Sequence, residues 1–434
     1  MKEDLIQYFW NSKTLAQQAL FTTTGEKLVI RSPGLLNADQ GPDFLFARIE
    51  IGGVLWVGHV EIHVRSSDWN LHGHVEDPHY NNTILHVVWE SNTEIQLHGS
   101  PLACLEIKDY LPRELFMKYE QLMLSELPIP CHHQLTNVSD SLKAIFIERL
   151  MIERFEVKTK KILQDWQNLG SDWEALLFHK IATYLVAPVN MNAMEALLCR
   201  VPFTLLNKYK HDLFMLEALL LGTAGLLQAP GEDQYAKALK KDFQFLQKKH
   251  LIHSLDPVEW KFLRMRPAHF PSLRLAQLAS MLHSKELWLS FVLETDQIKD
   301  LIPFFKIEPS SYWKMHYHFG KTSAKTSSRI IGDFALNVVF INAVCPVLFA
   351  YGSIQSEEKH CQKALRFLET LKVESNRITH MWKNYNFVLR HAGHSQAGIQ
   401  LYQSYCVHKK CTSCMIGNVI LKCGVHSDSN QANF

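Results

Sequence analysis

The sequence predicts an α+β fold, in which a mixed β-sheet near the N-terminus is followed by a large all-α region. Residues 27–106 contain short apolar runs that alternate with polar residues and are separated by turn residues, a pattern typical of strands. From Pro112 onward, apolar residues recur at the i, i+3, i+4 spacing of helices. A chain of 434 residues is long enough for separate domains. We therefore expect an α/β domain over residues 1–111 and a helical domain over residues 112–434.

The first domain is expected to begin with one or two amphipathic helices over residues 3–20, because apolar residues such as Leu5 and Phe9 have helical spacing. A hairpin turn at Gly52-Gly53 should join two of the strands that follow. The predicted strands are residues 27–31, 44–51, 54–57, 59–65 and 84–90, followed by two more strand-like runs before residue 111.

The second domain is expected to consist of helices separated by prolines. The apolar run 334–352 contains Asn337, Asn342 and Pro346, so we interpret it as a buried helix and not as a membrane span. The first residues lack the basic and apolar regions of a signal peptide, so we expect a cytoplasmic protein with no membrane partner. Further helices are predicted over residues 113–126, 139–168, 172–186, 191–199, 212–228, 233–250, 272–284, 286–295 and 357–372.

The strand 59–65, with the sequence HVEIHVR, holds the best candidate site. Side chains alternate between the two faces of a strand, so the ionisable residues of this strand should share one face. These residues are His59, Glu61, His63 and Arg65. Several ionisable groups on an otherwise apolar strand are unfavourable unless water, a metal ion or a substrate contacts them. The face that carries them is therefore the expected site of chemistry.

Asp43 at the start of the preceding strand should lie across the hairpin from Glu61. Two carboxylates on adjacent strands can hold Mg²⁺ or Mn²⁺, which would activate water for phosphodiester hydrolysis. Gly41-Pro42-Asp43 and Glu61-Ile62-His63 together resemble the PD-(D/E)XK nuclease superfamily over roughly residues 20–110, with His63 where a lysine is usual. The resemblance implies a restriction-endonuclease-like sheet, metal binding by Asp43 and Glu61, and catalytic roles for Asp43, Glu61 and His63.

Two other interpretations of this region remain open. In the first, Asp43 caps a turn while Glu61 and His63 form a solvated strand face paired with Arg48 or Arg65. In the second, the histidines of the loop after the strand bind Zn²⁺ or another transition metal together with His59 and His63, because neutral imidazoles suit these ions. The loop histidines are His72, His74 and His79.

Clustered cysteines near the C-terminus form a second candidate metal site. Cys406, Cys411, Cys414 and Cys423 have the spacing C-x4-C-x2-C-x8-C, which suits zinc or an iron–sulfur cluster. The fourth ligand would be either Cys423 or the distant Cys131. Some helicase-associated nucleases of the PD-(D/E)XK group similarly combine one remote cysteine with three clustered ones. The alternative is that these residues are reduced, buried cysteines without a metal.

Nucleic acid is one partner class that local basic segments would fit, although a formal net charge of +2 gives no general basic excess. Basic segments at 261–274 and 319–329 combine cations with aromatic residues or hydroxyls, as phosphate-contacting surfaces do. Either DNA or RNA would fit such surfaces. The alternative is that each segment is a solvated helix face.

The segments GPDF, VEIHVRSSDW, HGH and ILHVVW and the cysteine-rich end resemble a single family of bacterial proteins, a domain-of-unknown-function family, over nearly the full length. That resemblance implies one shared architecture and no particular activity. The expected function is a metal-dependent nuclease or a nuclease-derived nucleic-acid-binding protein. The alternative is a non-catalytic helical scaffold with a structural zinc site.

Overall fold

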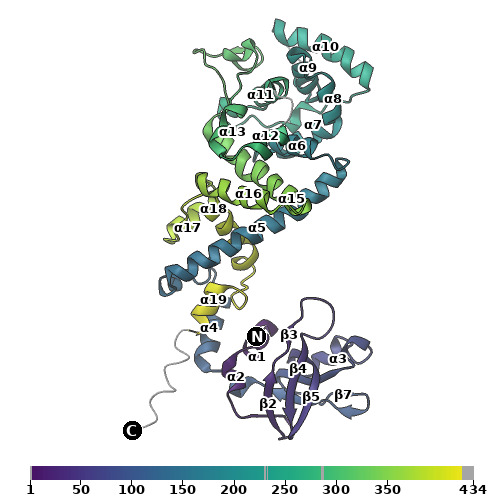
Figure 1. Cartoon of the computed structure of the whole chain (residues 1–434), viewed down its shortest axis with the longest axis vertical. Coiled ribbons are helices and arrows are strands. Elements are labelled where there is room, and N and C mark those ends of the chain that lie inside the picture. The colour runs from purple at the N-terminus through teal and green to yellow at the C-terminus, as the bar shows by residue number, and fades with distance from the viewer. Residues whose placement is uncertain (1, 229–230, 232, 285–287, 423–434) are drawn as a thin grey trace. The chain divides into compact units, whose positions relative to one another are not determined.

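The computed structural model describes residues 2–228, 231, 233–284 and 288–422 (Figure 1). The chain divides into two compact units: unit 1 comprises Met1–Phe146 and Tyr402–Phe434, and unit 2 comprises Ile147–Leu401. This division differs from the boundary predicted after residue 111. Residues 112–146 and the described part of the C-terminal segment pack with the sheet, so unit 1 is built from two separate parts of the chain.

Unit 1 contains a seven-stranded mixed sheet with the strand order β1-β2-β4-β5-β6-β9, and β3 pairs with β4 outside this path. Strands β2, β4 and β5 form an antiparallel meander, whereas β5, β6 and β9 run parallel to one another. This arrangement confirms the prediction of a mixed sheet at the N-terminus. The strands are β1 (Leu20–Phe21), β2 (Lys27–Ser32), β3 (Leu35–Leu36), β4 (Phe44–Ile51), β5 (Val54–Arg65), β6 (Thr83–Glu90) and β9 (Cys104–Glu106), with a small separate hairpin of β7 (Gln96–Leu97) and β8 (Ser100–Pro101).

Strand β5 is continuous through Gly58 and is covered on both faces in its second half. Val60 and Ile62 point to one face, and Glu61 and His63 point to the other, yet all four are buried. At the hairpin end, residues 54–57 are exposed on both faces. The face that carries the ionisable residues is therefore enclosed by other parts of unit 1.

The crossover between the parallel strands β5 and β6 encloses that face. It contains helix α3 (Asp68–Leu71) and a 3₁₀ turn at Pro78–Tyr80, and it places Trp69 and Tyr80 in a small buried cluster. Two parallel neighbouring strands require such a connection to return across the sheet. The histidine-rich loop is this crossover, which explains how its side chains reach the strand.

A β-bulge in β4 positions the start of that strand. The register of β4 against β5 shifts between Phe44 and Ala47, and Phe46 has a left-handed backbone conformation with φ of 59°. A bulge adds one residue to one strand and redirects the neighbouring side chains. The shift brings Phe44 opposite Val60 and places Asp43 beside Glu61 and Ile62.

Helices also contribute to unit 1. Helix α1 buries Leu5, Ile6, Phe9 and Trp10 and contacts β5 and β6, as the helical spacing predicted. Helix α19 contacts α4, and Figure 1 shows the yellow C-terminal helix beside it. The helices assigned wholly to this unit are α1 (Glu3–Trp10), α2 (Lys13–Ala16), α3, α4 (Arg113–Leu124) and α19 (Met415–Lys422), with 3₁₀ turns at Lys108–Tyr110 and His132–Asn137.

Unit 2 is a helical body with one large apolar core, as predicted. Helix α5 (Asp140–Asn168) begins in unit 1 and continues into unit 2. The other helices are α6 (Trp173–Leu185), α7 (Met191–Arg200), α8 (Phe203–Lys208), α9 (Leu213–Thr223), α10 (Gln234–His250), α11 (Pro271–Ser284), α12 (Trp288–Glu294), α13 (Ile298–Phe305), α14 (Asp333–Val339), α15 (Cys345–Ile354), α16 (Glu358–Thr370), α17 (Arg377–Asn384) and α18 (Ala392–Gln400), with short strands β10 (His316–His318) and β11 (Lys321–Thr322). The remaining turns are 3₁₀ at Pro257–Glu259, Pro267–His269 and Ser311–Lys314 and π-helical at Phe340–Val344 and Leu401–Cys406.

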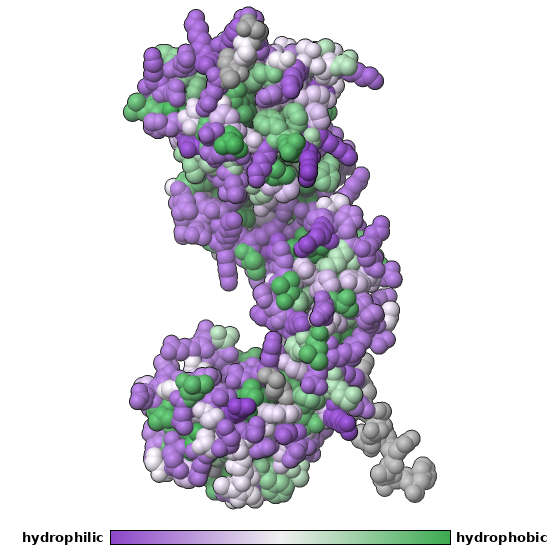
Figure 2. All heavy atoms as spheres, turned by 180° about the vertical axis from the view of Figure 1, so that it is seen from behind, coloured by the Kyte–Doolittle hydropathy of each residue, from purple (hydrophilic) through white to green (hydrophobic). Residues whose placement is uncertain are grey.

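Helices α14 and α15, joined by the π-helical turn, form one apolar segment over Asp333–Ile354. Within the described residues, this segment is the one helix long and apolar enough to cross a membrane, and 67% of its most apolar window is buried inside the protein. The core helix of a folded protein has the same length and composition, so these properties alone do not indicate a membrane span. In the view of Figure 2, hydrophilic side chains cover most of the surface and apolar side chains lie between them.

Candidate functional site

Three imidazoles converge beside Glu61 in unit 1. One nitrogen from each of His63, His72 and His74 lies within 4.8 Å of the other two. His63 comes from β5, whereas the other two come from the crossover. Glu61 Oε1 lies 3.5 Å from His63 Nε2 and 3.3 Å from His74 Nε2. The sheet and the crossover therefore supply three nitrogen ligands and a carboxylate to one point.

Asp43 lies on the far side of Glu61 and is held by the backbone. The Asp43 N–H donates a hydrogen bond to Glu61 Oε2 at 3.0 Å, and the Ile62 N–H donates to Asp43 Oδ2 at 3.0 Å. The Gln7 side chain donates to Asp43 Oδ1 at 2.9 Å. The structure thus brings Asp43, Glu61 and His63 together, and each Asp43 oxygen already accepts a hydrogen bond from the protein.

The surroundings of His63 and His74 favour the neutral form that a metal ion requires. Burial and the neighbouring imidazoles lower the pKa of His63 to about 3, and burial lowers the pKa of His74 as well. Burial raises the pKa of both Asp43 and Glu61, and the nearby Asp43 charge raises that of Glu61 further. A cation would reverse these carboxyl shifts because it stabilises the charged form.

The donor set fits a transition metal ion. His63 Nδ1 is hydrogen-bonded to His86 Nε2 at 2.9 Å, which leaves His63 Nε2 facing His72 Nδ1 at 3.1 Å. Two nitrogens bound to one tetrahedral zinc ion would be about 3.3 Å apart, given Zn–N distances of about 2.0–2.1 Å. His74 Nε2 is buried and lacks a hydrogen-bond partner, although Glu61 is close. Both observations are expected of groups arranged to bind a cation.

The structure separates the predicted site residues into two groups. His63, His72 and His74 come together, as the transition-metal interpretation required. His79 instead pairs with Asp77 at 2.7 Å in an exposed position, and His59 accepts a hydrogen bond from the Phe46 N–H at 3.3 Å. The solvated-face interpretation fails for Glu61 and His63 because their exposed fractions are only 5% and 1%.

Three residues that the sequence analysis did not single out also belong to this site. His86 is in register with Glu61 on the parallel strand β6 and orients His63. Glu3 and Gln7 are one turn apart on α1, and burial and the charge of Asp43 raise the pKa of Glu3. A histidine in the otherwise apolar strand ILHVVW was the available signal for His86. No local pattern links residues 3 and 7 to a strand site.

Removing one imidazole tests metal binding directly. We expect His63→Ala to weaken Zn²⁺ or Mn²⁺ binding at this site by at least about a hundredfold, because losing even an outer-shell partner costs about ten- to a hundredfold. Titration against a chromophoric chelator would measure the change. His79→Ala, in the same crossover but outside the cluster, should bind metal like the wild type. Equal affinities for the two variants would contradict the three-histidine site.

A second group of potential ligands in unit 1 consists of Cys131, Cys406, Cys411 and Cys414. Burial raises the pKa of all four thiols, and the other thiols raise the pKa of Cys131 and Cys406 further. The 3₁₀ turn that follows Cys131 contacts α19, which begins immediately after Cys414. The structure thus brings the turn after Cys131 against the helix that follows Cys414, but among the described residues the three histidines, and not these cysteines, have ligand atoms within 4.8 Å of one another; Cys423 lies outside the described residues.

Comparison with known proteins identifies the family but no activity. A family model with the description "Protein of unknown function (DUF2851)" matches residues 3–377, so the matched region includes both carboxylates, all the site histidines and Cys131 but ends before Cys406. No curated protein and no solved structure matches the chain. With most of its length covered by this model, the chain belongs to the DUF2851 family.

Proposed function

We propose that unit 1 is a metal-dependent nuclease. The observation that carries the proposal is the convergence of His63, His72 and His74 with the buried carboxylate of Glu61, beside the half-buried Asp43. Asp43 immediately precedes β4 and Glu61 lies on the neighbouring antiparallel strand β5 of a mixed sheet, which supports a restriction-endonuclease-like fold. Buried ionisable groups with strongly shifted pKa values are more typical of functional sites than of ordinary structural positions.

The three imidazoles would hold the ion, which supplies a Lewis acid for a phosphoryl oxygen and lowers the pKa of a bound water. Glu61 is placed to accept the proton of the attacking water, because its Oε1 faces two of the imidazoles while Oε2 is fixed by the Asp43 N–H. His86 keeps His63 in one orientation through the bond to Nδ1. Trp69 excludes water from the inner side, where it contacts His63, His74 and His86.

The ligand types favour Zn²⁺ or Mn²⁺ over Mg²⁺. Magnesium prefers an all-oxygen octahedral shell that retains several waters. Here imidazole nitrogens outnumber the free carboxylate oxygens, because both oxygens of Asp43 accept hydrogen bonds from Gln7 and Ile62. Imidazole suits zinc, and manganese accepts both donor types. The expectation of Mg²⁺ or Mn²⁺ at Asp43 and Glu61 is therefore refined to a mixed-ligand site.

The proposal is tested by incubating the purified full chain with single- and double-stranded DNA and RNA at low salt, with Zn²⁺, Mn²⁺ or Mg²⁺ added separately. We expect cleavage with Mn²⁺ or Zn²⁺ and none with a chelator. A protein that binds the metal at the three histidines but cleaves none of these substrates would contradict the nuclease proposal. The alternative of a non-catalytic protein with a structural metal site would then stand.

We further propose that the four cysteines hold one thiolate-bound metal centre, either a zinc ion or an iron–sulfur cluster. The segment around them is tied to the rest of unit 1: Asp4 accepts hydrogen bonds from Tyr119 on α4 and from Thr412. A Cβ atom at Gly417 would lie 2.2 Å from the Cys411 carbonyl oxygen, so α19 begins tightly against the cysteine loop. Buried protonated thiols release their protons when a metal binds.

Cys131→Ser should lower the bound metal by one zinc ion or one cluster per chain. It should also make the C-terminal segment more accessible to protease. Elemental analysis would distinguish zinc from iron, and visible absorption with acid-labile sulfide would identify a cluster. Trypsin should then cut faster at Lys409 or Lys410, because a structural metal site contributes directly to folding stability. Cys199→Ser, at an exposed and isolated cysteine, is the matched control. An unchanged metal content in Cys131→Ser would exclude Cys131 as a ligand.

A further inference from the structure

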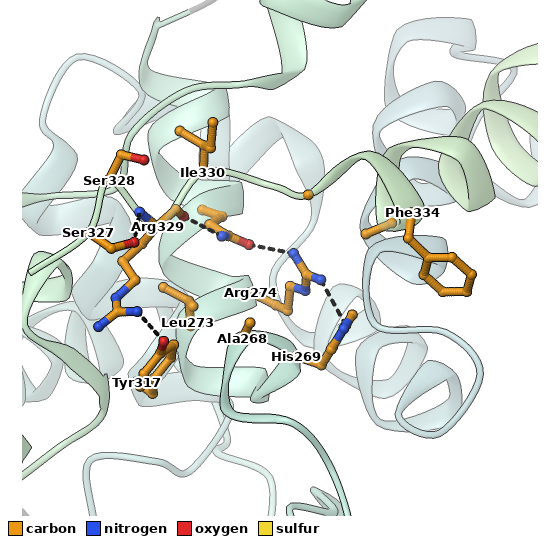
Figure 3. Close-up of a pocket in the computed structure, with 13 residues that line it drawn as sticks. Ala268, His269, Leu273, Arg274, Tyr317, Ser327, Ser328, Arg329, Ile330 and Phe334 are labelled. Atoms are coloured by element: carbon orange, nitrogen blue, oxygen red, sulfur yellow. Dashed lines mark hydrogen bonds between the residues drawn. The ribbon is translucent and has the colours of Figure 1, made fainter. Parts of the chain in front are cut away.

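Unit 2 contains a pocket, which we call the arginine pocket, with two buried arginines and no carboxylate in its lining. Its volume is about 260 Å³, and its polar lining includes Arg274, Gln277, Arg329 and Tyr317. Arg274 extends from α11, and Arg329 comes from the segment that precedes α14. Figure 3 shows the Arg274 guanidinium beside His269 and the Arg329 guanidinium turned away from it, toward Tyr317.

Both guanidinium groups are deeply buried. The exposed fractions of Arg274 and Arg329 are 2% and 8%, and among the described residues neither arginine forms an ion pair. The Nε atom of each arginine is buried without a hydrogen-bond partner. A buried charge is strongly unfavourable unless an opposite charge or enough hydrogen bonds compensate it. The missing opposite charge is the first indication of an anionic ligand.

Neutral groups hold the two arginines in place. Arg274 donates to Gln277 Oε1 at 2.9 Å and bonds to His269 Nδ1 at 3.0 Å, and Gln277 in turn donates to the Arg329 carbonyl oxygen at 2.6 Å. Since His269 Nδ1 accepts from a cation, the imidazole is neutral, in agreement with the pKa lowered by burial and by Arg274. These contacts hold the side chain of Arg274 and the backbone of Arg329 in position, but the neutral partners do not cancel the positive charge of the guanidinium groups.

Arg329 is held in an unusual conformation. Its φ is 51°, in the left-handed region that costs energy for a residue with a side chain. Its guanidinium lies over the Tyr317 ring, 3.7 Å from the centroid, and donates to Ser323 Oγ at 2.7 Å. Backbone strain of this kind is concentrated at ligand sites. The surrounding contacts hold the Arg329 guanidinium against Tyr317 and Ser323, while its backbone carbonyl accepts from Gln277 beside Arg274.

We propose that the arginine pocket binds the phosphate group of a phosphate ester. The Arg274 guanidinium is planar and presents several donors in a fixed arrangement, and its buried Nε–H has no partner among the described residues, so it can donate to a phosphate oxygen. Ser327 and Ser328 at the rim offer further hydroxyl donors, and apolar residues such as Ile330 can contact the organic part. The volume lies just below the range of about 300–1,000 Å³ for drug-sized ligands, so the pocket suits a phosphate with a short substituent.

The two basic segments predicted to contact phosphate support the proposal independently. The segment 261–274 ends with Arg274, and the segment 319–329 ends with Arg329. The fold brings these two ends to one pocket inside unit 2. The proposal does not depend on hydrolysis by unit 1, because none of the pocket residues belongs to that unit.

The test is phosphate binding by the full-length protein, measured by calorimetry and by the midpoint of thermal unfolding. Inorganic phosphate and phenyl phosphate should bind saturably and raise the midpoint, whereas chloride at equal ionic strength should not. Arg274→Met should weaken phosphate binding by about ten- to a hundredfold, the usual loss for a hydrogen bond to a charged group. No saturable phosphate binding by the wild type would overturn the proposal.

A merely structural role for Arg274 predicts a different result. If Arg274 only supported the fold, Arg274→Met would lower the unfolding midpoint without phosphate. We expect the midpoint to stay equal or rise, because an uncompensated buried charge is removed and the volume is kept. Arg264→Met, at an exposed residue of the same segment, should bind phosphate like the wild type. Equal phosphate affinity in Arg274→Met and Arg264→Met would also refute the proposal.

The source of the phosphate is distinguished with oligonucleotides. A single-stranded DNA oligomer with a 5′-phosphate, followed by fluorescence anisotropy, should compete with inorganic phosphate if the natural ligand is a nucleic-acid end. If the oligomer competes with inorganic phosphate on the wild type but not on Arg274→Met, the result would support phosphate binding in the arginine pocket and assign the ligand to nucleic acid. Competition by phenyl phosphate alone, again lost in Arg274→Met, would support the pocket and assign it to small phosphate esters.

Discussion

Glu61→Gln is expected to lower metal-dependent cleavage of nucleic acid by about 10²–10⁴-fold, the usual contribution of a general base. Glutamine keeps the volume and an oxygen that can accept from the Asp43 N–H, but it cannot take a proton from water. The fold should persist because the substitution also relieves the repulsion between the buried Glu61 and the half-buried Asp43. Initial rates of cleavage at saturating Mn²⁺ would measure the loss.

The control for this experiment is Glu90→Gln at the exposed end of β6, in register with Arg65 and outside the site. It should cleave like the wild type. Circular dichroism and metal content should be the same for both variants, so that a lost activity is not a lost fold or a lost ion. Full activity in Glu61→Gln would show that Glu61 is not the base and would redirect the search to Asp43 or Glu3.

Gly225→Ala is expected to destabilise unit 2 by about 2–5 kcal/mol. The φ of Gly225 is 76°, a conformation that costs about 1–2 kcal/mol for a residue with a Cβ atom. The added Cβ would also lie 2.3 Å from the Leu255 carbonyl oxygen, so the backbone of Leu255 must move. Overpacking of this kind typically costs another 1–3 kcal/mol. The Leu255 N–H donates to the Thr223 carbonyl, and this 2.7 Å bond would be strained as well.

The two costs can be separated with a second glycine. Gly170 has a similar φ of 71° but no atom within 4 Å of the position of a Cβ. Gly170→Ala should therefore show only the conformational cost, about 1–2 kcal/mol. Urea unfolding followed by tryptophan fluorescence would compare the variants. If the two substitutions destabilise the protein equally, the close approach of Leu255 contributes nothing.

Much of the fold follows from local patterns. The predicted strands 44–51 and 84–90 correspond to β4 and β6, and the predicted helices 139–168 and 233–250 correspond to α5 and α10. Helices α17 and α18 were not predicted, because α18 has a sequence of small and polar residues without a clear apolar stripe. The π-helical turns also have no local signal. Their extra residue is accommodated by packing within the unit.

The candidate site was predictable only in part. Strand parity correctly placed Glu61 and His63 on one face, since a period of two is intrinsic to the strand. Which of the neighbouring histidines join the site depends on the path of the crossover. That path turns His72 and His74 toward His63 and leaves His79 paired with Asp77. That path depends on the burial of Trp69 and Tyr80, a tertiary effect.

Long-range pairs were the least predictable. Cys131 was one of two alternatives for the fourth thiol, and only the tertiary contact between the 3₁₀ turn after it and α19 brings its segment beside the helix that begins after Cys414. Arg274 and Arg329 were each recognised as parts of basic segments, but a sequence contains no signal that two such segments meet. Charge composition alone predicts an exposed basic surface, whereas the structure buries these two cations in a pocket.

The division of unit 1 between the two ends of the chain has a consequence for biosynthesis. The 255 residues of unit 2, from 147 to 401, must be translated before Tyr402 emerges, which takes roughly ten seconds to a minute at typical elongation rates. During this interval α4 and the turn after Cys131 lack their contacts with α19. Unit 2 can fold as a unit in that time. Ribosomes that stop before residue 402 would release a chain whose N-terminal sheet is complete but whose apolar α4 surface stays open to aggregation or to a chaperone.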